Sequence, residues 1–144
     1  MTEPLYNTEI LRLAASIPHH ARLPEPMGSA EKRSPICGSR VTVDVAVDDA
    51  GRVSELGMLV RACALGQASA SLLGATVIGK SAQELAVARD AVAAWLAGEG
   101  PLPEWPGFAV MTPVLPHSAR HASIRLAFEA AAEATEAATA KAPA

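Results

Sequence analysis

The sequence predicts an α+β fold in which several helices pack against one face of a small antiparallel sheet of about three strands. The first reason is an alternation of valines with polar or small residues over residues 40–48, which is the period of a strand. The second is a turn at residues 49–51, after which residues 53–62 return as the partner strand of a hairpin. The third is a set of helical patterns on both sides of this hairpin.

Ahead of the hairpin, residues 5–17 are predicted to form a helix, with Pro4 suited to its first turn and Pro18 at its end. Residues 18–34 are rich in proline, histidine and charge, which is typical of a loop that leads into an edge strand. After the hairpin, residues 65–78 are predicted to form a helix of mostly small residues. Such a helix can approach its neighbours closely.

The second half of the chain is predicted to be helical around an irregular segment. Ser81 and Glu84 form a capping-box pattern at the start of a helix that continues to residue 96. Residues 98–117 contain five prolines and are expected to be mostly irregular. The last helix is expected to begin near Ser118.

Length and composition exclude several classes of protein. The chain has 144 residues and a net charge of −3, without a run of Lys or Arg that would follow a nucleic acid backbone. It has no apolar stretch of about 20 residues for a membrane span, and Glu3 and Glu9 do not fit a signal peptide, so we expect a cytoplasmic protein. We interpret residues 1–134 as one domain and residues 135–144 as an Ala-rich tail that frays.

The two cysteines, Cys37 and Cys63, are too few for a disulfide framework and are expected to be free thiols, metal ligands or reactive groups. Cys63 lies where the second strand ends and a helix begins, and a helix start favours the thiolate, which could accept sulfur or bind a soft metal. The alternative for Cys63 is a buried cysteine that acts as a small hydrophobic residue. Cys37 precedes the first long strand beside Gly38, and its alternative is a turn cysteine without a partner.

Four motifs, taken in order, resemble those of the NifU/IscU-type scaffold proteins of iron–sulfur cluster assembly. Pro35-Ile36-Cys37-Gly38 resembles the family's Pro-x-Cys-Gly-Asp. Residues 63–71, with the sequence CALGQASAS, resemble its second cysteine motif, Cys-Ala-x-Ser-x-Ala-Ser-x-Ser. Gly79-Lys80-Ser81 matches the Gly-Lys-Ser that follows, and residues 119–128 are similar to the segment that carries the family's third cysteine.

The resemblance covers residues 5–131, and the long segment over residues 98–118 is similar to the SufU-like branch. Three positions depart from the family pattern, among them Ala122, where the family has His or Lys next to its third cysteine. Ser39 stands where the family has an aspartate, and Ser123 stands where it has the third cysteine. A serine hydroxyl is a poor ligand for soft iron or zinc, because it holds its proton far more tightly than a thiol does.

His121 lies two residues before Ser123 and could reach the same site. On a regular helix these two side chains point about 200° apart, so only one of them can face the cysteines. Arg61 and Arg120 could bind an anionic persulfide or a carboxylate of a partner, although a solvated surface charge is the ordinary interpretation for both.

The resemblance implies a scaffold or carrier rather than an enzyme. A cysteine desulfurase would deliver sulfur to Cys63 or Cys37, iron would join it, and other cluster-assembly proteins would be further partners. Two thiolates per chain could supply all four ligands of a 2Fe–2S cluster across the twofold axis of a homodimer.

Two alternatives remain open at the level of sequence. One is a degenerate zinc-binding or adaptor module, in which Cys37 and Cys63 bind zinc and His121, Ser39 or water completes the site. The other is a sulfur-relay protein that carries a persulfide on Cys63 and needs no complete set of ligands.

Overall fold

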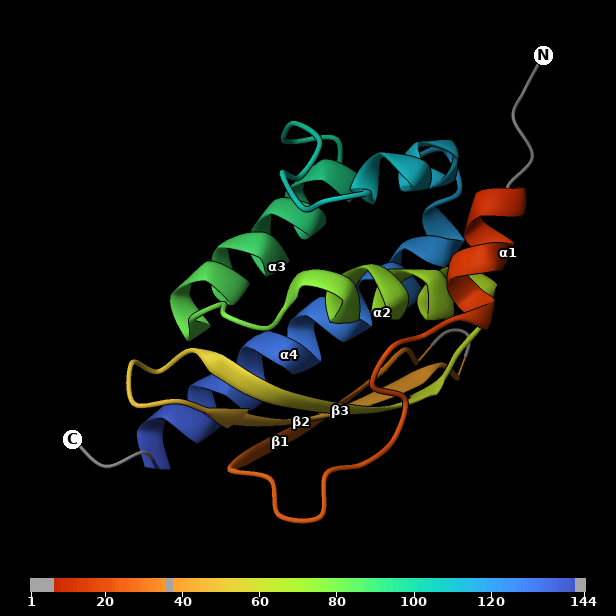
Figure 1. Cartoon of the computed structure of the whole chain (residues 1–144). Coiled ribbons are helices and arrows are strands. Elements are labelled where there is room, and N and C mark those ends of the chain that lie inside the picture. The colour runs from red at the N-terminus through yellow and green to blue at the C-terminus, as the bar shows by residue number, and fades with distance from the viewer. Residues whose placement is uncertain (1–6, 36–37, 142–144) are drawn as a thin grey trace.

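The computed structural model describes residues 7–35 and 38–141, and every structural statement below concerns these residues. Its elements, in chain order, are α1 (Thr8–Ala15), β1 (Gly28–Arg33), β2 (Arg40–Val47), β3 (Val53–Arg61), α2 (Ala64–Thr76), α3 (Ala82–Leu96), the 3-10 helices η1 (Phe108–Val114) and η2 (Ser118–Arg120), and α4 (His121–Lys141). The strands form an antiparallel sheet in the order β1-β2-β3. The helices lie on one side of this sheet, which confirms the predicted α+β fold (Figure 1).

The strand β2 is buried on both faces, which its alternating sequence does not predict. Val41, Val43 and Val45 face the helices and are fully buried. On the opposite face, Thr42 and Asp44 are also buried, because the segment between α1 and β1 crosses there. This segment also covers the free edge of β3. There Met58 N donates a 2.9 Å hydrogen bond to His19 O. A covered edge cannot pair with another chain.

Asp44 anchors this crossing segment to the sheet. Its carboxylate accepts hydrogen bonds from Arg22 Nε at 2.6 Å, Arg22 Nη2 at 3.0 Å, Leu23 N at 3.1 Å and Ser29 Oγ at 2.6 Å. Burial alone would raise the pKa of Asp44, but the hydrogen bonds from Arg22, Ser29 and Leu23 outweigh it and hold the pKa below its ordinary value. The ionised carboxylate is therefore the form that the fold stabilises.

We expect Asp44→Asn to lower the free energy of unfolding at neutral pH by about 1–3 kcal/mol, because an amide replaces an acceptor that has four donors. A depressed pKa contributes stability that is present above the unfolded-state value of about 4 and is lost as the pH falls through the folded-state value. The difference in the free energy of unfolding between wild type and Asp44→Asn should therefore become smaller at acidic pH. Urea unfolding at several pH values measures this, with Asp90→Asn, an exposed carboxylate, as a control that changes stability by less than about 0.5 kcal/mol.

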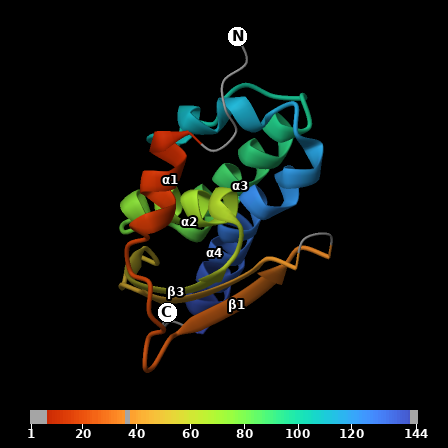
Figure 2. The same cartoon turned by 90° about the vertical axis from the view of Figure 1, so that its right-hand side faces the viewer.

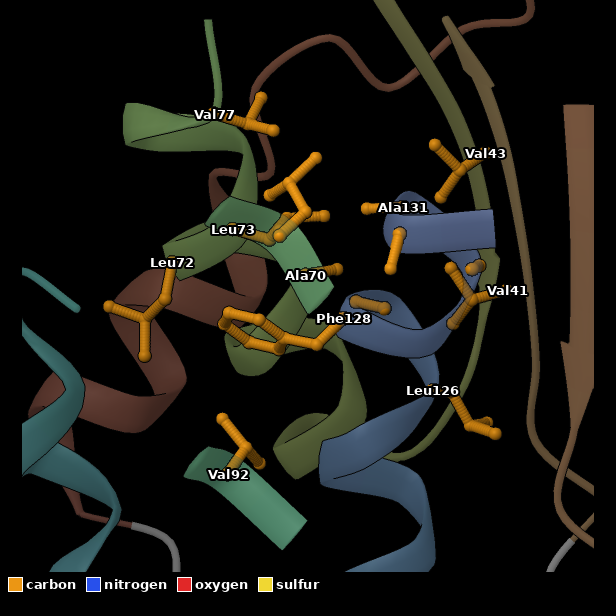
Figure 3. Packing of buried hydrophobic residues seen from close by; sticks show 14 of the residues in the cluster. Val41, Val43, Ala70, Leu72, Leu73, Val77, Val92, Leu126, Phe128 and Ala131 are labelled. Carbon is orange, nitrogen blue, oxygen red and sulfur yellow. The ribbon is translucent and has the colours of Figure 1, made fainter. Parts of the chain in front are cut away.

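The helix α4 lies across β1 and β2 and forms the centre of the core. Figure 3 shows Val41 and Val43 of β2 beside Ala131 of α4, and the ring of Phe128 pointing from α4 toward α2. The sheet-facing side of α4 is alanine at most positions, so the helix and the sheet approach closely. A Cβ on Gly28 of β1 would lie 2.1 Å from Ala134 O, which only glycine avoids.

This close packing explains why α4 is longer than predicted. The sequence predicts fraying beyond residue 134, because the tail is rich in alanine and polar residues. In the structure α4 continues to Lys141, and both Thr135 and Ala138 are buried. Residues 135–141 are therefore part of the packed helix, because the fold places β1 against them.

The remaining elements agree with their patterns, except that Gly28–Arg33, predicted to be part of a loop, forms strand β1. The predicted capping box at α3 is present, with Ser81 Oγ accepting from Glu84 N at 3.1 Å and Glu84 Oε1 accepting from Ser81 N at 3.1 Å. The proline-rich segment over residues 98–117 is mostly irregular but includes η1. Its Trp105 donates a hydrogen bond from Nε1 to Leu72 O of 2.7 Å, which fixes the segment on α2. Within the described residues, no helix is both long and apolar enough to cross a bilayer.

Candidate functional site

Three segments that are distant in sequence meet at one end of the sheet, on the right in Figure 1: the connection from β1 to β2, the junction of β3 with α2, and the start of α4. The register pairs Arg40 with Arg61, so the start of β2 lies beside the end of β3. The β1–β2 connection closes on itself through a 2.9 Å hydrogen bond from Ser34 N to Ser39 O. These contacts bring the predicted positions Ser39 and Cys63 to the same end of the molecule.

Cys63 is the N-cap residue of α2. Its backbone is extended, with φ −66° and ψ 170°, and its carbonyl accepts the first helical hydrogen bond from Gln67 N at 2.9 Å. Its side chain makes no capping hydrogen bond, although the N-cap is the position where a side chain ordinarily accepts one. The thiol is half-buried and free. The thiol therefore lies at the N-terminal, positive end of α2 but does not cap the helix with a hydrogen bond.

The start of α4 lies directly against the first turn of α2. A Cβ on Gly66 would lie 3.3 Å from Ser123 O and 3.5 Å from Ser123 Cβ, so the two helices touch at this glycine. One turn further along α2, Ser69 Oγ donates a 2.6 Å hydrogen bond to Ile124 O. The small residues of the CALGQASAS motif therefore allow the close approach that places Ser123 near the helix start at Cys63.

Ser39 and Ser123 are in direct contact with each other. Their Oγ atoms lie 3.3 Å apart, within hydrogen-bond distance, and the residues are 3% and 1% exposed. This contact joins the β1–β2 connection to the start of α4. Each of the two buried hydroxyls therefore has the other as a hydrogen-bond partner.

His121 is turned toward η1 instead of toward this serine pair. Its Nε2 lies 3.2 Å from Val114 O and 3.0 Å from Leu115 O. Because carbonyl oxygens only accept, Nε2 carries the hydrogen, and Nδ1 is the ring nitrogen with a lone pair when the ring is neutral. From the sequence, His121 and Ser123 are expected to point to opposite sides of the helix. In the structure Ser123 contacts Ser39, and His121 does not.

The predicted ligand Cys37 lies outside the described residues, between Pro35 and Gly38. Among residues 7–35 and 38–141, no group of three or more His, Cys, Asp or Glu side chains is arranged to hold a metal ion. A complete metal centre within one chain would need Cys37 together with Cys63 and further ligands.

A row of three arginines at this end of the sheet is a feature that the sequence did not predict as a set. Arg33 pairs with Arg40 across β1 and β2, and Arg40 pairs with Arg61 across β2 and β3. Cross-strand partners share a face, so the three side chains lie side by side. Glu31 lies next to the row, and its pKa is lowered, chiefly by the hydrogen bond that it accepts from Arg33. Only the strand register reveals this arrangement.

A larger hollow lies away from these residues, between α3 and residues 100–105. Its volume is about 730 Å³, and Lys80 lies over the ring of Trp105 at its edge, 5.5 Å from the ring centre. None of the predicted site residues lines it. The chemistry that the sequence suggests therefore belongs to the end of the sheet at Cys63.

Comparison with known proteins agrees with the arrangement of these segments. Residues 5–141 match the model of the NifU-like N-terminal domain. A crystal structure of the N-terminal part of a nitrogen-fixing NifU-like protein from Brucella abortus is 41% identical, with a TM-score of 0.89, and the match covers 96% of each chain. A SUF-system protein from Fervidobacterium islandicum AW-1, described as an iron–sulfur cluster assembly scaffold, has a TM-score of 0.82.

The Fervidobacterium protein is 19% identical, and the match covers 91% of this chain and 96% of that one, so it supports the fold alone. A comparison with curated proteins gives no match. The family match spans nearly the whole chain and agrees with the resemblance carried by the cysteine motifs. The chain therefore belongs to the family of NifU-like N-terminal domains.

Proposed function

We propose that this protein acts in iron–sulfur cluster assembly, as a scaffold that accepts sulfur and iron and holds the cluster between two copies of the chain. The observation that carries the proposal is the position of Cys63 at the start of α2, at the same end of the sheet as the Ser39–Ser123 pair, in a chain of the NifU-like family. The similar fold of the Fervidobacterium protein described as a cluster scaffold supports it. The expected setting is the cytoplasm, with a cysteine desulfurase and other assembly proteins as partners.

Cys63 is the proposed sulfur acceptor. Its thiolate attacks the outer sulfur of a persulfide on the donor protein, a new S–S bond forms on Cys63, and the donor cysteine leaves as a thiolate. This transfer needs no separate oxidant, because the outer sulfur is already in the oxidised state that it keeps. The transferred sulfur would lie at the N-terminus of α2, where the first backbone N–H groups of the helix have no intrahelical acceptor.

The number of thiolates explains why two chains are proposed. Ser39 and Ser123 are hydrogen-bonded to each other as neutral hydroxyls, so each chain offers Cys37 and Cys63 as its soft ligands. A 2Fe–2S cluster ordinarily takes four cysteine ligands, which two chains related by a twofold axis can supply. On this proposal, cluster assembly and dimer formation are the same event.

Anaerobic reconstitution of the full chain with iron and sulfide tests the proposal. The expected result is visible absorbance of a cluster, one cluster for every two chains, and a dimer by light scattering that reverts to monomer when a chelator removes the iron. A colourless monomer after reconstitution would overturn the proposal. The same procedure without sulfide is the control for iron that binds without forming a cluster.

A second candidate is a degenerate zinc-binding or adaptor module. The hydrogen-bonded Ser39–Ser123 pair favours it, because two hydroxyls stand at positions where a cluster scaffold is expected to have a carboxylate and a thiol. Zinc would take Cys37 and Cys63, with water completing the site, because His121 is turned toward η1. Metal analysis of protein purified without added iron separates the two. One zinc per chain that blocks cluster formation would favour this candidate, and no metal would favour an adaptor.

A persulfide relay is the third candidate, and it is favoured by the placement of Cys63 alone. The thiol makes no capping bond and is half-exposed, so it can react without the other ligands. Transfer of labelled sulfur from a desulfurase to a monomer that never binds iron would favour the relay. A Cys63→Ser variant that still accepts the label would exclude it.

A further inference from the structure

Arg33, Arg40 and Arg61 form an arginine row across all three strands, at the same end of the sheet as Cys63. Together with Gly38 they line a hollow of about 110 Å³. Adjacent strands are about 4.8 Å apart, so the row is about 10 Å long. A hollow of this size takes a carboxylate or another small group, and it is too small for a nucleotide base with its sugar.

The charge of the row is only partly balanced. Among residues 7–35 and 38–141, Glu31 is the one carboxylate beside it, with Oε2 3.1 Å from Arg33 Nε and Oε1 3.8 Å from Arg40 Nε. Within the described residues, Arg61 has no carboxylate partner. Three guanidinium groups therefore face one carboxylate in a chain whose net charge is −3, so the row is a local positive region on an acidic protein.

The fold does not require this arrangement. Like charges on directly opposite positions of neighbouring strands are destabilising, and here two such contacts are adjacent. The side chains are also not part of the core, since the side chain of Arg33 is 65% exposed and that of Arg40 is 34% exposed. A repulsive and solvent-facing row is explained by a negatively charged group that binds to it.

We propose that the arginine row is the docking site for an acidic segment of a partner protein, with one carboxylate of that segment in the hollow. A planar guanidinium binds a carboxylate through two parallel hydrogen bonds, which a lysine cannot do. In an extended peptide, side chains at positions i and i+2 are about 7 Å apart, so two acidic residues with this spacing fit within the row.

The arginine row lies close in sequence to both cysteines. Arg61 precedes Cys63 by two residues, and Gly38 belongs to the same connection as Cys37. A partner held by the row therefore lies at the same end of the sheet as the proposed sulfur acceptor, on the sheet face that carries Thr42 and Asp44. The docking itself needs neither iron nor sulfur, so its test stands apart from the test of cluster assembly.

The test uses the full chain without iron or sulfide and a fluorescein-labelled hexaglutamate peptide, with hexaglutamine as the uncharged probe. Fluorescence anisotropy should show binding of hexaglutamate at low salt that weakens about tenfold or more toward 0.3 M NaCl. Arg61→Glu and Arg40→Glu should each weaken binding at least tenfold. Lys141→Glu is the matched control, because it makes the same change of charge at the opposite end of α4 (Figure 2) and should change binding less than twofold.

Glu31→Gln tests the proposal in the opposite direction. It removes the one carboxylate beside the row while keeping an acceptor for Thr42, so hexaglutamate should bind several-fold more tightly. Equal losses in Arg61→Glu, Arg40→Glu and Lys141→Glu would show a general charge effect and overturn the proposal. Displacement of the peptide by millimolar inorganic phosphate as effective as by free hexaglutamate would also overturn it, because the hollow would then be a site for small anions.

Discussion

Cys63→Ser is expected to abolish cluster formation while leaving the protein at least as stable as wild type. The variant loses the thiolate that we propose as sulfur acceptor and ligand, so cluster absorbance after reconstitution should fall to less than about a tenth of the wild-type value. Serine is a preferred N-cap residue, and Cys63 makes no capping bond in α2. The variant should therefore gain about 0.5–1 kcal/mol in the free energy of unfolding.

The two opposite effects distinguish a functional cysteine from a structural one. If Cys63 acted only as a small buried hydrophobic residue, serine would cost stability and leave reconstitution unchanged. Ala64→Ser is the matched control, because it adds a hydroxyl to the next residue of the same turn and keeps the thiol. Anaerobic reconstitution and thermal unfolding of the three proteins give both readouts. A Cys63→Ser protein that still assembles a full cluster would contradict the proposed role.

The second prediction with a large effect is that the double variant Ser39→Asp with Ser123→Cys acquires metal binding within a single chain. The two hydroxyls are in contact and buried, so their replacements will also lie side by side. Without metal, a buried carboxylate next to a thiol is poorly solvated, and we expect a loss of about 2 kcal/mol in the free energy of unfolding. Metal that binds only the folded chain reverses this loss, by about 4 kcal/mol at a thousand-fold excess over the dissociation constant.

Thermal unfolding with and without zinc, together with zinc content, measures this effect. The double variant should bind one zinc per chain as a monomer, and its unfolding temperature should rise with zinc far more than that of wild type. The matched control is Ser39→Ala with Ser123→Ala, which removes the same hydrogen bond and adds no ligand. A double variant that binds no more zinc than this alanine pair would show that the two positions do not form part of a metal site.

The second prediction depends on the resemblance described from the sequence, which implies a carboxylate at the position of Ser39 and a thiol at the position of Ser123. In this chain the two serine hydroxyls lie within hydrogen-bond distance of each other. Either substitution alone would leave a charged or reactive group beside a hydroxyl in a buried place, whereas the pair is neutral and satisfied.

The fold could be predicted from sequence wherever a local pattern has one physical solution. The valines of residues 40–48 can be buried together only in a strand, and the reciprocal hydrogen bonds of Ser81 and Glu84 form only at a helix start. Residues 135–141 were predicted to fray, because no local feature of an Ala-rich segment holds it in a helix. The contact with Gly28, more than 100 residues away, supplies the missing stabilisation.

The candidate site, like the fold, could be predicted from the sequence only in part. The sequence placed Cys63 at a helix start and identified Ser39 and Ser123 as the changed positions, since these are properties of motifs. It left open whether His121 or Ser123 faces the cysteines, because the rotation of a helix depends on what packs against it. In the structure Ser123 lies against Gly66 and Ser39, and His121 lies against η1.

By itself, the sequence determined the elements, the family resemblance and the residues with reactive side chains, because hydrophobic period, capping and motif spacing are local. The tertiary structure alone decided which of those residues meet: the serine pair across two segments and the arginine row across three strands. Such meetings depend on strand register and on the distance between helix axes. These are set by the packing of the whole core, in which the buried alanines of α4 and the missing side chains at Gly28 and Gly66 take part.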